Sequence, residues 1–160
     1  MAFQKPAGKG KVETIELDTA TSHILEECRM VLPGIQALFG FQLIAVFNQG
    51  FGDKLSQVEQ LVHLAALILT VLATVLVMTP AALHRQAEPM EVSERFVWLA
   101  SNLILAAMYP LAVAVALDVY VVASVVTKSD ATGALLAVAV LIVFIAFWIL
   151  VPRREKRFPR

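Results

Sequence analysis

The chain has 160 residues, which is the length of one domain. Apolar residues make up 59% of it and charged residues 16%, more apolar surface than a soluble fold of this size can bury. The formal net charge of +0 gives no reason to expect a nucleic-acid partner, and the single cysteine, Cys28, excludes an internal disulfide and paired-thiol redox chemistry.

The N-terminal segment, residues 1–20, is polar and rich in Lys, Gly and Pro. It is predicted to be a disordered cytoplasmic segment without a secretory signal. A short amphipathic helix is expected to follow and to lie along the cytoplasmic membrane surface. Its polar face carries Glu26, Glu27 and Arg29, and its other face is apolar. Pro33 then falls in the first turn of a membrane span, or kinks the junction.

Four apolar stretches each exceed the roughly 20 residues that an α-helix needs to cross the hydrocarbon core. They place membrane spans at about residues 31–51, 58–82, 95–120 and 131–151. The second and fourth spans contain runs that are apolar on all sides, which is not typical of helices in a soluble bundle. The sequence therefore predicts an all-α, polytopic membrane protein whose four transmembrane helices form an antiparallel bundle within residues 21–152.

Local signals mark the ends of these spans. Ser56 and Glu59 have the spacing of a capping box at the start of the second span. Ser129 or Asp130 can cap the fourth span, and Pro152 is expected to close it.

The third apolar stretch continues past an acidic residue, Asp118. This residue lies 22 positions after Phe96, or about 33 Å along a straight helix. We therefore expect Asp118 at the outer membrane interface in a solvated role, with a place on an ion pathway as the alternative.

Basic residues are distributed unevenly over the two sides of this topology. All Lys and Arg residues except Lys54 and Lys128 lie before the first span, in the middle loop or in the basic tail, residues 153–160. By the positive-inside rule both termini are cytoplasmic, and a bacterial inner membrane is the expected location.

Polar side chains within or close to the spans have two interpretations. They are Gln36, Gln42, Gln49, His63, Asn102 and Tyr109. Such groups do not face lipid cheaply, so hydrogen bonding between helices is the first interpretation. The second is a polar lining for a permeation path along the first span. A pore or proton route usually needs an ionisable group at depth, and none is expected in these spans.

Charged residues next to the first three spans form a second group of candidates on the cytoplasmic side. They are Glu26, Glu27, Arg29, His84, Arg85 and Arg95. If the first two spans are antiparallel neighbours, the carboxylates and the His-Arg pair meet at one membrane surface. The group is then either a charge-paired collar or a pH-responsive gate, because a histidine titrates near physiological pH.

No catalytic, metal or cofactor site is predicted, so the chain is expected not to be an enzyme. His63 and His84 are 21 positions apart on one predicted helix, or about 31 Å, too far to hold one ligand within a monomer. No serine follows the pattern of a nucleophile turn, and no glycine-rich phosphate loop occurs.

Three motifs, "LEECRMVLPGIQALFGFQL", "TPAALHR" and "ASN", carry a resemblance to a known family. Over roughly residues 25 to 150 the chain resembles a family of short bacterial four-helix membrane proteins known only as a domain of unknown function. The matching residues are Glu26, Arg29, Leu32, Pro33, Gly34, Gln36, Phe39, Phe41, Pro80, Ala81, His84 and Arg85. Asn102 stands where the family commonly has Arg. The resemblance implies the fold and the cytoplasmic group, and it implies no activity.

Two functions are therefore expected to compete. The first is a non-enzymatic membrane subunit in the lipid bilayer that forms a homo-oligomer or joins a larger membrane complex. Small residues four apart, Ala112 with Ala116 and Gly133 with Ala137, favour it because they let helices approach closely. The alternative is an oligomeric ion channel or small-solute transporter whose first span lines the path and whose cytoplasmic Glu/His/Arg group acts as a gate.

Overall fold

The computed structural model describes residues 16–87 and 92–155, and every element in these two ranges is helical. The predicted disordered segment, up to residue 15, and residues 156–160 of the basic tail lie outside the described residues. The long helices are α1 (Leu17–Phe47), α3 (Gln57–Ala87) and α4 (Glu94–Thr127). The last helical run consists of α5 (Asp130–Ile145), one π-helical turn η1 (Ala146–Leu150) and α6 (Val151–Glu155). A short helix, α2 (Phe51–Lys54), connects α1 to α3.

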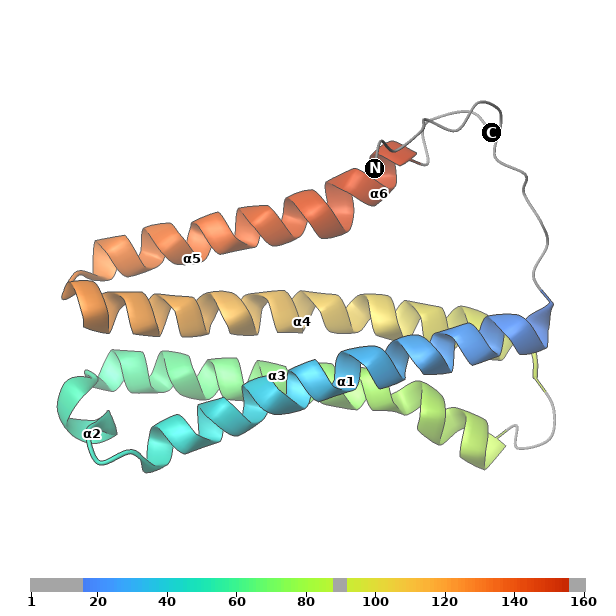
Figure 1. Cartoon of the computed structure of the whole chain (residues 1–160), viewed down its shortest axis with the longest axis horizontal. Helices are drawn as coiled ribbons and strands as arrows, with labels where there is room; N and C mark the ends of the chain where they lie inside the picture. The colour runs from blue at the N-terminus through green and yellow to red at the C-terminus, as the bar shows by residue number, and fades with distance from the viewer. Residues whose placement is uncertain (1–15, 88–91, 156–160) are drawn as a thin grey trace, which may run out of the picture.

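Four helical segments are long and apolar enough to cross a membrane, which confirms the prediction of four such helices. The first of them ends at Phe47, before the predicted end of the first span at about residue 51. Consecutive long helices run in opposite directions (Figure 1). Two ends of the molecule follow from this. We call the end at which α1 starts, α3 ends, α4 starts and α6 lies the basic end, and the end with α2 and the α4–α5 turn the α2 end.

The first helix departs from the expectation of a short surface helix followed by a separate span. It is one continuous helix of 31 residues with Pro33 inside it. Its buried positions Thr21, Ile24, Cys28, Ile35 and Gln42 are spaced by multiples of a helical turn and form one face. Because this face continues from the amphipathic segment into the span, the segment packs on the bundle. Pro33 removes one backbone hydrogen bond, a loss that membrane helices tolerate.

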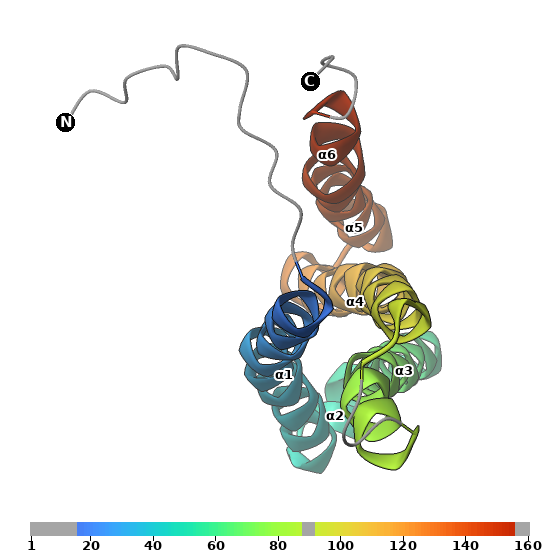
Figure 2. The same ribbon diagram turned by 90° about the vertical axis from the view of Figure 1, so that its right-hand side faces the viewer.

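Small side chains hold α3 and α4 together. Ala66 and Ala73 of α3 and Ala100 and Ala114 of α4 have no exposed surface, so the two backbones lie close. α1 packs across both of these helices, and α5 packs mainly on α4 (Figure 2). The predicted antiparallel arrangement is thus a three-helix core of α1, α3 and α4, with α5 against the outer side of α4.

The predicted helix caps are present. The Oγ of Ser56 accepts a hydrogen bond from the backbone N–H of Glu59 at 3.3 Å, and Oε2 of Glu59 accepts one from the N–H of Ser56 at 2.7 Å. Ser129 caps α5 by accepting from the N–H of Thr132 at 3.3 Å. Pro152, however, does not close the last helix, which continues to Glu155.

The π-helical turn explains how the last helix passes this proline. Pro152 lacks an N–H, and in an α-helix its ring would crowd the carbonyl four residues earlier. The preceding turn is widened, so the N–H of Val151 donates to the carbonyl of Ala146, five residues back.

α5 is anchored to α4 at Gly133. A Cβ built there would overlap the Oγ of Ser124 and lie 2.9 Å from the carbonyl oxygen of Tyr120. Ala112 and Ala116 are likewise buried within the chain. The small residues that favoured self-association are therefore used, in large part, for packing inside one molecule.

Gly133→Ala is expected to lower the free energy of unfolding by about 1–3 kcal/mol, because the added methyl group must displace α5 from α4. Unfolding of the purified protein in mixed micelles, followed by tryptophan fluorescence, measures this. Gly34→Ala is the matched control, since a Cβ at Gly34 meets nothing within 4 Å. Equal stability of the two variants would mean that this contact does not hold α5.

Candidate functional site

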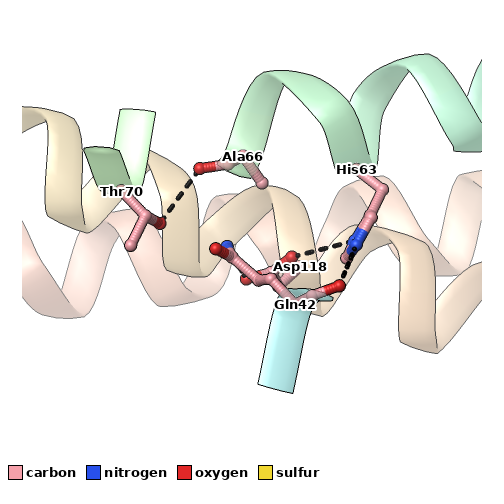
Figure 3. A network of polar contacts seen from close by, with 5 residues as sticks. All are labelled: Gln42, His63, Ala66, Thr70 and Asp118. Atoms are coloured by element: carbon pink, nitrogen blue, oxygen red, sulfur yellow. Dashed lines mark hydrogen bonds and ion pairs between the residues drawn. The ribbon is translucent and has the colours of Figure 1, made fainter. Parts of the chain in front are cut away.

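Three polar side chains from three helices meet between α1, α3 and α4 near the α2 end (Figure 3). The side-chain amide of Gln42 donates to Oδ2 of Asp118 at 2.7 Å. Nδ1 of His63 lies 3.4 Å from Oδ1 of the same carboxyl group. Nε2 of His63 lies 3.0 Å from the backbone carbonyl oxygen of Gln42. We call Gln42, His63 and Asp118 the polar triad.

The partners of His63 determine how its ring is protonated. A backbone carbonyl only accepts hydrogen bonds, so Nε2 of His63 must carry a hydrogen and donate it to Gln42. In a neutral ring Nδ1 then has a lone pair, which would face the lone pairs of the Asp118 carboxylate. The contact is attractive only when one proton resides on the pair, either on Nδ1 of His63 or on the carboxyl of Asp118. We call the His63–Asp118 pair, which has no net charge when it shares one proton, a one-proton site.

The triad is enclosed by the bundle. Gln42 is 3% exposed, His63 is 6% exposed, and the side chain of Asp118 is 20% exposed. Counted along their helices, the three residues lie roughly 8–14 Å inside the helix ends at the α2 end. At that depth an unpaired carboxylate would be costly, so the pairing of Asp118 stabilises its position.

Neighbouring groups orient the imidazole. The ring of Phe51 packs edge-on against His63, with ring centroids 5.4 Å apart. One turn before His63, Glu59 belongs to the capping box that begins α3. Thr70, about two turns after His63, is buried and donates to the carbonyl of Ala66 in its own helix, as expected for threonine in a membrane helix.

A pocket of about 490 Å³ opens beside the triad, whose three residues all line it. Its walls are otherwise mostly apolar, with contributions from α1, α2 and α4. Lys54 and the exposed residues Phe41 and Val126 lie on the solvent- or lipid-facing part of the lining, and the triad is its most buried polar part. An apolar cavity with a few convergent polar groups is the usual form of a small-molecule site.

The other intramembrane candidates do not join the triad. Gln36 and Gln49 are exposed, and neither side chain has a hydrogen bond to any residue that the structure describes. Asn102 is exposed and donates to the carbonyl of Trp98 in its own helix. Tyr109 is 53% exposed and lines a smaller, apolar pocket of about 180 Å³ between α4 and α5.

The charged residues of the basic end are not joined to one another. Within residues 16–87 and 92–155 no ion pair involves Glu26, Glu27, Arg29, Arg85 or Arg95, and all five are exposed. His84 is half-buried and packs against Phe96, with ring centroids 5.6 Å apart. Its Nδ1 is buried without a hydrogen-bond partner among the described residues. The predicted meeting of carboxylates with His84 is therefore absent from this arrangement.

Asp118 and His63 also change the expectation that no ionisable group lies at depth. Asp118 was expected at the headgroups because its position was measured from Phe96 along a single crossing. α4 runs on for nine residues beyond it, to Thr127, so Asp118 lies inside the bundle. The sequence did contain a signal for this position, because Asp118 falls at the same level of the antiparallel bundle as Gln42 and His63. Gln42 is near the end of α1 and His63 is near the start of α3, so the two helices bring them to one level.

The fold and this site define a multi-pass helical membrane protein with a buried amide–imidazole–carboxyl cluster. In the described part of the chain no three His, Cys, Asp or Glu side chains gather as a metal site would require. The chain belongs to the Family of unknown function (DUF6328), whose model matches residues 12–152, and this confirms the predicted resemblance to a family of unknown function. Comparisons with curated proteins and with solved structures give no match.

A double-mutant cycle of Gln42→Leu and Asp118→Leu is expected to give a coupling energy of about 0.6–1.7 kcal/mol, the range of hydrogen bonds between membrane helices. Free energies of unfolding in mixed micelles supply the four values. The matched control pairs Gln36→Leu, on the same helix, with Asp118→Leu and is expected to be additive. Additivity of both pairs would show that the amide and the carboxyl do not stabilise each other.

Proposed function

We propose that the protein has a non-enzymatic role in the membrane: it binds a small amphiphilic solute in the pocket beside the polar triad and links this binding to the proton on His63 and Asp118. This is the small-solute alternative of the sequence analysis, with the first span contributing to the binding path. It is a proton-linked carrier rather than an open channel, since the pocket ends at a buried cluster.

One observation carries this proposal, namely that the one-proton site lies on the wall of an apolar pocket. A solute that approaches Oδ1 of Asp118 changes the energy of the proton shared there, and loss of the proton changes the charge that the solute meets. Binding and protonation are then linked, as any two events at one site are. The depth of the triad adds to this effect, because charges interact more strongly away from water.

The orientation of the molecule belongs to the same proposal. The excess of basic residues at the basic end favours a cytoplasmic position for that end in a bacterial inner membrane. The pocket and the triad would then lie in the outer half of the bilayer, with Lys54 near the outer headgroups.

The proposal is tested with purified protein in liposomes that contain a pH-sensitive dye. A panel of cationic, neutral and anionic amphiphiles is added, and at least one is expected to cause proton movement above that of protein-free liposomes. Ala45→Phe fills the pocket lining of α1 and should reduce the signal to background. Ala37→Phe is the matched control, on the same helix but exposed and outside the lining, and should leave the signal unchanged.

A complete absence of solute-dependent proton movement would contradict the proposed function. So would a signal in Ala45→Phe as large as in the unchanged protein, because the pocket would then have no part in it.

A second candidate function, the self-associating subunit, is favoured by Gln36. This amide lies about 17 Å from the end of α1 at the α2 end, near the membrane midplane, and it is exposed without a polar partner among the described residues. An amide carries both donors and an acceptor, so the same residue of a second copy can satisfy it.

Gln36→Leu is therefore expected to weaken self-association by about 0.6–1.7 kcal/mol for each interhelical hydrogen bond that it removes. Particle stoichiometry in mild detergent, measured over a range of dilutions, reports the change. Gln49→Leu is the control, since that exposed amide follows α1 at its end. A monomer at all concentrations in the unchanged protein would eliminate this candidate.

A further inference from the structure

We infer that the solute of the pocket is a lipophilic organic cation, which binds in exchange for the proton of His63 and Asp118. This inference rests on the proposed function and specifies its substrate class. It follows from the charges of the triad, from the hydrogen-bonding groups left without partners, and from the pocket lining.

The charge of the triad depends on the proton that His63 and Asp118 share. With its shared proton the His63–Asp118 pair has no net charge, whether the proton lies on the ring or on the carboxyl. When the proton leaves, His63 keeps the hydrogen on Nε2 that it donates to Gln42, and Asp118 becomes an unneutralised carboxylate. Oδ1 of Asp118 then faces a lone pair of His63. In a buried environment this negative charge is costly, and a monovalent cation restores neutrality.

The hydrogen-bonding groups of the triad also favour a positively charged ligand. The amide of Gln42 donates one of its two Nε2 hydrogens to Oδ2 of Asp118, and its Oε1 is buried with no hydrogen-bond partner among the described residues. Once the proton has left, three acceptors of the triad have no donor in the described part of the chain: Oε1 of Gln42, Oδ1 of Asp118 and Nδ1 of His63. They outnumber the remaining donor, the second Nε2 hydrogen of Gln42, and together with the charge of Asp118 they favour a positively charged ligand over an anion.

The pocket selects for an organic cation rather than a metal ion. Its volume of about 490 Å³ and its largely apolar walls suit hydrocarbon groups. Phe41 and Phe51 belong to the lining, and aromatic rings attract organic cations. Hard metal ions instead require a shell of several oxygen ligands, which one carboxylate and one amide oxygen do not provide.

The other charged groups near the triad leave Asp118 as the acidic group that can receive a cation. Lys54 of α2 lines the pocket and is exposed, so it opposes a cation weakly across solvent or headgroups. Glu59 of α3 is buried, but its carboxylate accepts hydrogen bonds from the N–H and hydroxyl of Ser56. On α1 the facing group is the neutral Gln42, and on α4 it is Asp118 itself. Asp118 is thus the acidic group available to a cation, and Lys54 is the group that should modulate its affinity.

The test compares two organic ions of nearly the same size and opposite charge, tetraphenylphosphonium and tetraphenylborate. Binding to the full chain in nanodiscs of zwitterionic lipid is measured by calorimetry between pH 6 and 8, with empty nanodiscs as background. Buffers with different ionisation enthalpies report the protons released. We expect tetraphenylphosphonium to bind with release of up to one proton per cation. Its affinity should increase with pH, by at most about tenfold per pH unit for a one-proton exchange.

Three variants make the comparison specific. Asp118→Asn keeps the shape of the carboxyl but removes its charge, so the cation should no longer bind and no proton should be released. Lys54→Gln removes the opposing charge and should strengthen cation binding about two- to fivefold. Lys128→Gln removes the other lysine at the α2 end, outside the pocket lining, and should leave affinity unchanged. Because Lys54 is exposed, its variant tests the inference even if Asp118→Asn does not fold.

The inference is overturned if tetraphenylborate is the ion that binds, or if tetraphenylphosphonium binds without proton release and with no effect of Lys54→Gln. In those cases proton movement driven by another member of the amphiphile panel, and lost in Ala45→Phe, would leave the proposed function intact. Absence of both cation binding and solute-driven proton movement would contradict the inference and the proposed function together.

Discussion

The contact between His63 and Asp118 is the interaction on which the arrangement of the core depends. A carboxyl group inside a membrane helix bundle must be neutralised or paired, and Asp118 receives one partner from each of the other two core helices. His63 in turn binds the backbone of Gln42, which fixes the height of α1 relative to α3. Within the described residues, every side-chain hydrogen bond or ion pair between the long helices belongs to this triad.

Away from the triad, the helices are held together by close packing of small side chains. Buried alanines allow α3 and α4 to lie close along much of their length, and Gly133 allows α5 to approach α4 near the α2 end. Lipid competes well for larger apolar side chains, so close packing of small residues is an effective way to hold membrane helices together. The two kinds of contact have different consequences: the alanine contacts are indifferent to pH, whereas the contact between His63 and Asp118 requires a proton.

The helices could be predicted from the sequence because each depends on its own residues. Uninterrupted apolar length identified the four spans, and the spacing of Ser56 and Glu59 identified the start of α3. The triad was not predicted, because Gln42, His63 and Asp118 are far apart in the chain and meet only through the relative rotation and height of three helices. Their common level in an antiparallel bundle was the available signal, but level alone does not show which faces of the helices meet. The prediction that the charged residues of the basic end meet was wrong, because it considered their level in the membrane and not the helix faces on which they lie. Nearness to the same membrane surface did not bring Glu26 and Arg29 to His84, since they lie on an exposed face of α1.

Gln42 shows that a polar residue in a membrane span can both hydrogen-bond between helices and line a functional site. Its amide joins α1 to α4, yet it also lines the pocket and leaves an acceptor unsatisfied. A purely structural contact would be better served by another stripe of alanines, because a buried ion pair often stabilises a fold no more than well-packed apolar residues do. A buried pair whose attraction disappears with one proton is a poor choice for holding helices together. The same property makes it useful for coupling, because the energy lost when the proton leaves is regained when another positive charge takes its place. The proposed exchange at the pocket would use this property of the triad.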